Sequence, residues 1–195
     1  MRTIPAFVVL AGATTMKKSI FVVAFAASVV CASGLLAKEG MVRFFSTTPI
    51  ENIEGISSTA VSSLNLDSGK IAIKARNTTF VFHNKLMQEH FNENYIESTK
   101  FPTSSFTGNV SGLNREAFNS GKKVPVTIEG NLDVHGVVKP YRTTGYLQKA
   151  ADGSVTGDTK FFVKLGNHGI KVPSVVQNKM SDSMEITSKF TWRPE

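Results

Sequence analysis

The sequence predicts a mainly β protein, an antiparallel up-and-down barrel of about eight strands with one or two short helices. Three observations favour this fold class. The run 124–134 alternates between apolar and polar residues for longer than a usual strand. Shorter alternating runs recur along the chain and are separated by turn residues. The strand–helix–strand spacing that a parallel sheet requires is not found in the sequence.

The run 124–134 gives the clearest indication of a barrel. Its apolar face carries Val124, Val126, Ile128, Leu132 and Val134. A period of two places this face against a dry interior and the polar face in water. At about 3.3 Å per residue the run spans roughly 36 Å, against about 17–20 Å for the usual strand. Such a strand, with Gly130 at a bend, favours a tall closed barrel whose apolar interior could hold a hydrophobic molecule.

Residues 1–37 have the pattern of a secretory signal peptide. A short basic start at 16–18 precedes an uncharged run, 19–37, that is rich in Phe, Val and Ala and closes on small residues. Cleavage after Ala37 or after Gly34 fits this pattern, and Met16 is a better start than Met1.

A transmembrane anchor is the alternative interpretation of this segment, because about 19 uncharged residues could just span a bilayer. Its many Ala, Ser and Gly residues make it weakly hydrophobic, which favours the signal peptide. We therefore expect an exported domain, 38–195, that is not an integral membrane protein after signal cleavage.

Cysteine content and charge narrow the function of the mature chain. The only cysteine, Cys31, lies in the signal segment, so we expect no disulfide, thiol nucleophile or cysteine-based metal site. The formal charge of +7 falls by three, to +4, when Arg2, Lys17 and Lys18 leave with the signal. The remaining lysines are spread thinly, without the aromatic-interleaved basic stripe of a nucleic-acid-binding surface, so no nucleic acid partner is expected.

A short helix is expected early in the mature chain. Thr48 can cap it, Pro49 fits its first turn, and Glu51 can complete a capping box. Ile50 and Ile53 would share one face and lie against the barrel.

Strand patterns cover most of the remaining chain. The predicted strands are 41–46, 70–74, 79–82, 103–110, 124–134, 141–147, 159–165 and 184–192. Between the third and fourth of these, the period becomes helical: Met87, Phe91 and Tyr95 recur four apart within 85–98. This amphipathic helix would lie over one end of the barrel.

Several motifs, in the right order, resemble those of a known family. The segment 88–95, followed by Lys100-Phe101-Pro102 and Phe106-Thr107-Gly108, resembles its central helix, its Tyr/Phe-Pro turn and the next strand. Residues 133–140 resemble its His-Gly-Val-Thr-Lys-Pro signature, with Val138 where Thr is usual.

A late strand, 161–165, and Gly169-Ile170 resemble the family's Asp-Tyr-Gly-Ile corner, with Asn167 and His168 in place of Asp and the aromatic residue. Over about 40–192, the chain thus resembles the YceI-like lipid/polyisoprenoid-binding family.

The resemblance implies a lipocalin-like barrel that holds a long isoprenoid or other amphiphilic lipid for transport or sequestration. It implies export to the periplasm, no catalytic residue, no cofactor other than a bound lipid such as a polyisoprenoid or isoprenoid quinone, and pairing into a homodimer. The inward residues are then the candidate ligand-binding lining: Ile71, Ile73, Phe80, Phe82, Met87, Phe91, Phe106, Val126, Ile128, Leu132, Val134, Tyr141, Phe161, Val163, Ile186 and Phe190.

Two other functions stay open at this point. A structural stress protein with a filled barrel would hold no ligand, because eight-stranded barrels can be filled by their own side chains. A small barrel enzyme, of the isomerase or cyclase type, would need inward polar groups, for which Tyr141, Thr143 and Ser188 are the candidates.

The histidines do not predict a metal site. His83, His90, His135 and His168 lack the spacing of helix or hairpin ligands, so no metal is expected. We expect His135 to form a local bond at a strand-to-strand corner, where Gly136 supplies a backbone shape that a side chain would disfavour. The alternative for His135 is contact with a ligand headgroup at the barrel rim.

Overall fold

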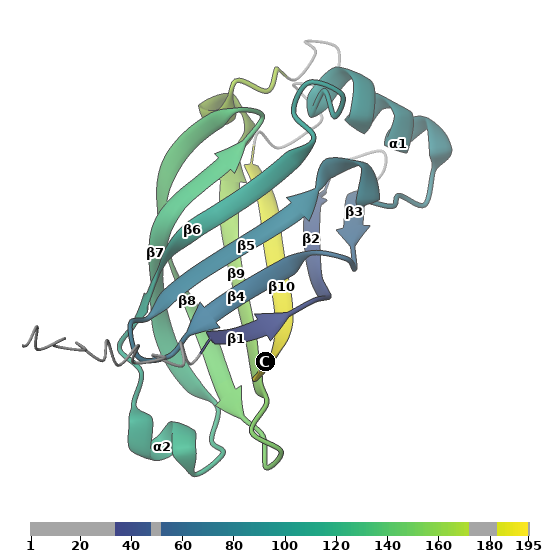
Figure 1. The fold of residues 1–195 in the computed structure, drawn as a ribbon. Helices are drawn as coiled ribbons and strands as arrows, with labels where there is room; N and C mark the ends of the chain where they lie inside the picture. Colours follow the sequence, from purple (N-terminus) through teal and green to yellow (C-terminus); the bar gives the residue numbers. More distant parts are fainter. Residues whose placement is uncertain (1–33, 48–51, 172–182, 195) are drawn as a thin grey trace, which may run out of the picture. The chain divides into compact units, whose positions relative to one another are not determined.

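The computed structural model describes residues 34–47, 52–171 and 183–194, whose strands form one antiparallel sheet that closes on itself (Figure 1). The strands are β1 (Gly34–Ala37), β2 (Gly40–Ser46), β3 (Ile53–Ser57), β4 (Val61–Asn65), β5 (Lys70–Arg76), β6 (Thr103–Ser111), β7 (Val124–Val134), β8 (Val137–Lys149), β9 (Val155–Lys164) and β10 (Ser183–Pro194). No helix of the described residues is both long enough and apolar enough to span a membrane.

The closed ring has eight positions, because two of its strands are each divided in two. Along one edge β10 pairs with β9, and along the other it pairs with β2 and then β1. β1 pairs in turn with β4, and β2 with β3, so β1–β2 and β3–β4 each occupy one position. From β4 to β10 each strand pairs with the next. The predicted antiparallel up-and-down barrel of about eight strands is confirmed.

β7 covers the run that alternation predicted, Val124–Val134. Inside the barrel, Gly130 lies opposite Gly108 of β6, and a Cβ on Gly130 would lie 2.6 Å from the Gly108 Cα. The same Cβ would lie 2.7 Å from the ring of Phe106. Glycine is therefore required at this bend, because it lets the two backbones approach and leaves room for the aromatic ring.

The predicted amphipathic helix is present as α1 (Lys85–His90), which continues as a π-helical turn, η2 (Phe91–Tyr95). Its first turn is capped by Asn84, whose side chain accepts hydrogen bonds from the backbone N–H groups of Leu86 and Met87. This helix lies over one end of the barrel, at the top of Figure 1. No residue of α1 or η2 is fully buried.

The predicted strand 79–82 is wrong. Asn77–Thr79 form a 3₁₀ turn, η1, in which the hydroxyl of Thr79 donates to the carbonyl of Arg76 at 2.7 Å. After this turn, Val81 forms only an isolated bridge with Ile56 of β3. The turn nevertheless leaves Phe80 and Phe82 buried, as the sequence analysis expected.

The helix expected near Thr48 falls mostly on 48–51, which lie outside the described residues. Its expected apolar contact Ile53 is the first residue of β3, so that part of the prediction is wrong. Two further elements were not predicted, β4 and the short helix α2 (Arg115–Asn119), which is capped by Asn114.

The barrel includes four residues that the sequence analysis assigned to the signal segment. Gly34–Ala37 form β1, in which Leu35 and Ala37 are buried. Cleavage after Gly34 would leave most of this strand in the mature chain, whereas cleavage after Ala37 would remove it. The cleavage position stays a prediction.

One end of the barrel is filled by its own side chains. At this end lies a cluster of residues that are each no more than 3% exposed: Leu64, Phe118, Val124, Val155 and Trp192. We refer to this cluster as the closed end. The indole N–H of Trp192 donates to the hydroxyl of Ser62 at 3.0 Å, so its one polar group is satisfied in this dry environment. α2, which supplies Phe118, lies at this end, opposite α1 (Figure 1).

Candidate functional site

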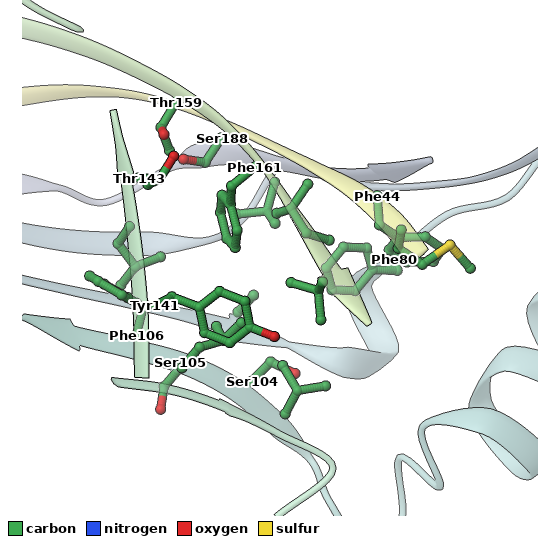
Figure 2. Close-up of a pocket in the computed structure, with 18 of the residues that line it drawn as sticks. Phe44, Phe80, Ser104, Ser105, Phe106, Tyr141, Thr143, Thr159, Phe161 and Ser188 are labelled. Atoms are coloured by element: carbon green, nitrogen blue, oxygen red, sulfur yellow. The ribbon is translucent and has the colours of Figure 1, made fainter. Parts of the chain in front are cut away.

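A cavity of about 290 Å³ lies inside the barrel. This volume is near the lower bound of about 300 Å³ for small-molecule sites. The lining is mostly aliphatic and aromatic, with a few hydroxyl groups (Figure 2). Within the described residues the barrel is therefore not filled completely by its own side chains.

Every residue of the predicted lining except Val126 lines this cavity. Val126 has the inward phase of β7, but it is 3% exposed and packs in the core one inward position from Val124 of the closed end. Alternation identifies the face on which a side chain lies, but it does not show how far along the barrel the interior is filled.

An aromatic cluster lines the end of the cavity beneath α1. Phe44 of β2 lies at its centre, with ring centroids 5.1 Å from Phe91, 5.3 Å from Phe80 and 5.5 Å from Phe82. We call these four residues the helix-end cluster. The sequence analysis missed Phe44, although alternation across its predicted strand 41–46 would have placed Phe44 on one face with Val42.

Trp192 and Phe190 line the opposite part of the cavity. Their rings stack with centroids 5.6 Å apart, next to Leu147 of β8. Phe161 and Tyr141, which are in edge-to-face contact at 5.8 Å, also line the cavity, and Figure 2 shows their rings next to each other. Aromatic side chains therefore line the cavity along its length.

The inward polar residues Tyr141, Thr143 and Ser188 all line the cavity, as their phase predicted. The structure adds Ser104 and Thr159, which the sequence analysis missed although they share the inward phase of Phe106 and Phe161. Figure 2 shows the side chains of Thr143, Thr159 and Ser188 grouped on one wall of the cavity.

A hydrogen bond between Tyr141, which is partly buried, and His168, which is buried, joins the cavity wall to the corner after β9. The Tyr141 hydroxyl lies 3.0 Å from Nε2 of His168, in the 3₁₀ turn η3 (Leu165–His168), and the two rings stack at 5.8 Å. Nδ1 of His168 donates to the Val137 carbonyl at 2.9 Å. Burial raises the pKa of Tyr141, because an apolar environment disfavours the phenolate.

His135 lies at a strand-to-strand corner, as the sequence predicted, but its bonds are to residues distant in the sequence. Nδ1 of His135 donates to the His168 carbonyl at 3.2 Å, and Nε2 lies 2.7 Å from the Glu97 carboxylate. With φ values of 55° and 70°, His135 and Gly136 form the two-residue turn between β7 and β8, where glycine is favoured. His135 does not line the cavity, so the alternative role at a ligand headgroup has no geometric support.

The four histidines do not assemble a metal site in the part of the chain that the structure describes. No group of three or more His, Cys, Asp or Glu side chains comes together there.

Comparison with known proteins agrees with this fold. A family model described as the YceI-like domain matches residues 36–192. Among solved structures, the chain is similar to a polyisoprenoid binding domain from Saccharophagus degradans implicated in plant cell wall breakdown. The TM-score is 0.70 at 11% identity, over 84% of this chain and 99% of that one.

Two further solved structures are similar. BcnA of Burkholderia cenocepacia has a TM-score of 0.66 at 12% identity, over 78% of this chain and 95% of that one. A YCEI protein of Campylobacter jejuni has a TM-score of 0.55 at 15% identity, over 70% and 81%. No curated protein matches the chain. At these identities the structural likeness concerns the fold, but the family model spans nearly the whole barrel, and the chain belongs to the YceI-like family.

Proposed function

We propose that this protein binds an isoprenoid or other amphiphilic lipid inside its barrel and carries or sequesters it, with no catalytic step. The observation that carries the proposal is the cavity of about 290 Å³, which is lined almost throughout by aliphatic and aromatic side chains. Membership of the YceI-like family, and the similarity to a domain described as polyisoprenoid binding, support the same ligand class.

The physical driving force for binding is burial of the lipid chain. Each Å² of apolar surface removed from water contributes roughly 25 cal/mol, so a branched chain gains several kcal/mol before ordering costs. The rings of Phe44, Phe106 and Phe161 provide flat apolar contacts for such a chain. Because one methylene more or less changes little, we expect broad specificity for the tail.

Access to the cavity is proposed beneath the helix of α1 and η2. Met87 and Phe91 of this helix line the cavity, yet none of its residues is fully buried. Moving the helix would therefore expose less apolar surface than opening the closed end, where Trp192 and Leu64 are almost inaccessible.

The proposed location is the periplasm, reached through the signal segment within residues 1–37. The support is the basic start at 16–18 and the uncharged run that follows. N-terminal sequencing of protein recovered from a periplasmic fraction tests this proposal and determines the cleavage position. Homodimer formation also stays a prediction, which analytical ultracentrifugation of the same sample would test.

The ligand is tested by purifying the protein from its native source without detergent, extracting it with organic solvent and analysing the extract by mass spectrometry. We expect a co-purifying isoprenoid lipid, such as a polyprenol or an isoprenoid quinone. An empty extract from protein that also fails to bind an apolar fluorophore would contradict the proposal. Chemical conversion of an added isoprenoid would instead support the enzyme alternative.

A matched pair of variants controls for nonspecific lipid adsorption. Phe161 lines the cavity, whereas its neighbour Phe162 points outward and is 61% exposed. We expect Phe161→Gln to reduce the amount of bound lipid, because it places an amide in the apolar cavity. Phe162→Gln, the same substitution on the outer face, should retain the lipid.

A further inference from the structure

Several hydroxyl groups on the cavity wall already donate their proton in a hydrogen bond to another group of the protein. A free hydroxyl can both donate and accept a hydrogen bond. A hydroxyl whose proton is held by a buried acceptor can only accept from a ligand. The hydrogen bonds of the described residues show which case applies.

Tyr141 is the first such group. The Val137 carbonyl can only accept, so the Nδ1 atom of His168, 2.9 Å away, carries a proton. An imidazole ring with its proton on Nδ1 has an acceptor at Nε2, and the His168 ring that presents this acceptor is 0% exposed. The Tyr141 hydroxyl, at 3.0 Å, therefore donates to Nε2. Only its oxygen lone pairs are available to the cavity.

Ser104 is the second. The amide nitrogen of Asn77 donates to the Phe101 carbonyl at 2.6 Å, which fixes the orientation of the Asn77 side chain. The amide oxygen of Asn77 then faces Ser104, whose hydroxyl donates to it at 2.8 Å. Asn77 is 1% exposed, so this acceptor is held as firmly as His168. Ser104 also presents lone pairs alone to the cavity.

Two threonines on the cavity wall follow the same pattern. The hydroxyl of Thr159 donates to the Thr144 carbonyl at 2.9 Å, and that of Thr143 donates to the Lys160 carbonyl at 3.3 Å. The hydroxyl oxygens of these four residues can thus act only as acceptors towards the cavity, which favours a ligand that brings its own proton.

We propose that Tyr141 and Ser104 form an acceptor-only site for the headgroup of the bound lipid, and that this site selects a neutral hydroxyl-bearing headgroup, such as an isoprenoid alcohol or hydroquinone, over a carbonyl. The inference rests on the proposed function, since it requires a lipid in the cavity. His168 is a positioning residue: it acts by holding the Tyr141 proton.

The chemistry of other headgroups explains the selection. A carbonyl oxygen would face the lone pairs of Tyr141 and Ser104 and would lose its hydrogen bonds to water without replacement. A phosphate would bring the same mismatch together with a buried charge. Asp158, the one carboxylate among the described residues that line the cavity, is paired with Lys123 at 2.7 Å and is not available to hold an ammonium headgroup. A hydroxyl satisfies the site without a charge.

The test compares two short isoprenoids with the same tail, farnesol and farnesal, which carry an alcohol and an aldehyde. Their affinities are measured by displacement of N-phenylnaphthylamine, an uncharged fluorophore, from the full barrel domain. We expect the wild type to bind farnesol about tenfold more tightly than farnesal, since an unmet polar group inside a protein costs about that much. Tyr141→Phe and Ser104→Ala should each reduce this ratio, by about threefold.

His168→Phe gives the sharper test, because it keeps an aromatic ring beside Tyr141 and removes the acceptor. The Tyr141 proton then becomes available to the cavity, so farnesal should bind more tightly while farnesol, which Tyr141 and Ser104 can still accept from, changes little, and the farnesol-to-farnesal affinity ratio should fall towards one. A change that merely loosened the fold would weaken both ligands together and leave the ratio unchanged. Thr144→Val, which deletes a hydroxyl on the outer face of β8, is the matched control and should keep the wild-type ratio.

The outcomes separate this inference from the proposed function. Equal affinities of the wild type for farnesol and farnesal would overturn the acceptor-only site while leaving lipid binding intact. So would a preference that disappears in Ser188→Ala but persists in Tyr141→Phe and Ser104→Ala. Failure of both isoprenoids to displace the fluorophore would instead count against the proposed function itself.

Discussion

The two ends of the barrel bury their apolar side chains to different degrees. At the closed end, Trp192 is 3% exposed and Leu64 is 1% exposed. In the helix-end cluster, Phe80 and Phe82 are buried, but Phe44 and Phe91 are only partly buried, and Phe91 belongs to a helix that has no fully buried residue. The comparison indicates a division of roles, in which the closed end stabilises the fold and the helix end admits the ligand.

The largest expected effect is at the closed end. Trp192→Ala should lower the free energy of unfolding by about 3–5 kcal/mol, because it opens a cavity among close-packed side chains and removes the N–H group that donates to Ser62. Denaturant unfolding measures this loss. Phe162→Ala, at an exposed aromatic residue on the outer face, should cost less than about 1 kcal/mol. Similar losses in both variants would argue against the role assigned to the closed end.

Removal of β1 should have the next largest effect. A chain that begins at Lys38 should be less stable than one that begins at Gly34 by about 2–4 kcal/mol, since buried Leu35 alone contributes about 1.5–3 kcal/mol. The truncation also unpairs edges of β4 and β10. Thermal unfolding of the two chains checks this expectation. Equal midpoints would show that the barrel does not need β1 and would remove the structural objection to cleavage after Ala37.

A smaller stability effect is expected at the helix end. Phe91→Ala should cost about 1–2 kcal/mol, because its ring is only partly buried. Its effect on ligand binding should be larger, since Phe91 stacks on Phe44 at the edge of the cavity. Unfolding and fluorophore binding are measured on the same sample. If Phe91→Ala lost as much stability as Trp192→Ala and left fluorophore binding unchanged, the helix end would stabilise the fold and would not admit the ligand.

The smallest expected effect is a pH dependence near Tyr141. Burial raises the pKa of its phenol above the ordinary value of 10.0, so the folded state holds the proton more tightly than the unfolded state. The resulting stabilisation is complete below about pH 10 and is lost as the pH rises through the raised value. The stability advantage of the wild type over Tyr141→Phe should therefore shrink in alkali. A difference independent of pH, measured by thermal unfolding, would contradict this account.

Long alternating strands were predictable from the sequence, because each has enough residues to reveal its period. β7 matches the predicted range, and β8 and β10 extend the predicted ranges by a few residues. β4 was missed because its pattern is inverted: Ser62 faces the interior, where it accepts from Trp192, and Val61 is 45% exposed. A hydrogen bond to a residue so distant in sequence leaves no local signal.

The candidate site divides in the same way. Phase along the strands predicted the apolar lining, and Thr159 and Ser104 could have been added by the same rule. The bonds of Tyr141 with His168 and of Ser104 with Asn77 could not be predicted, because each joins residues 27 positions apart. Which atom donates in each bond depends on the backbone carbonyl that the His168 or Asn77 side chain contacts with its other polar atom. Those contacts form only in the folded barrel.

The pairing of β1 with β10 has a consequence for how the molecule forms. Leu35 and Leu36 meet Arg193 and Pro194, so the seam joins the first and last strands that the structure describes. β10 also provides the pairing edge for β2. The barrel therefore cannot close until β10 has been made, and its closure depends on pairings between residues far apart in the sequence, which form slowly.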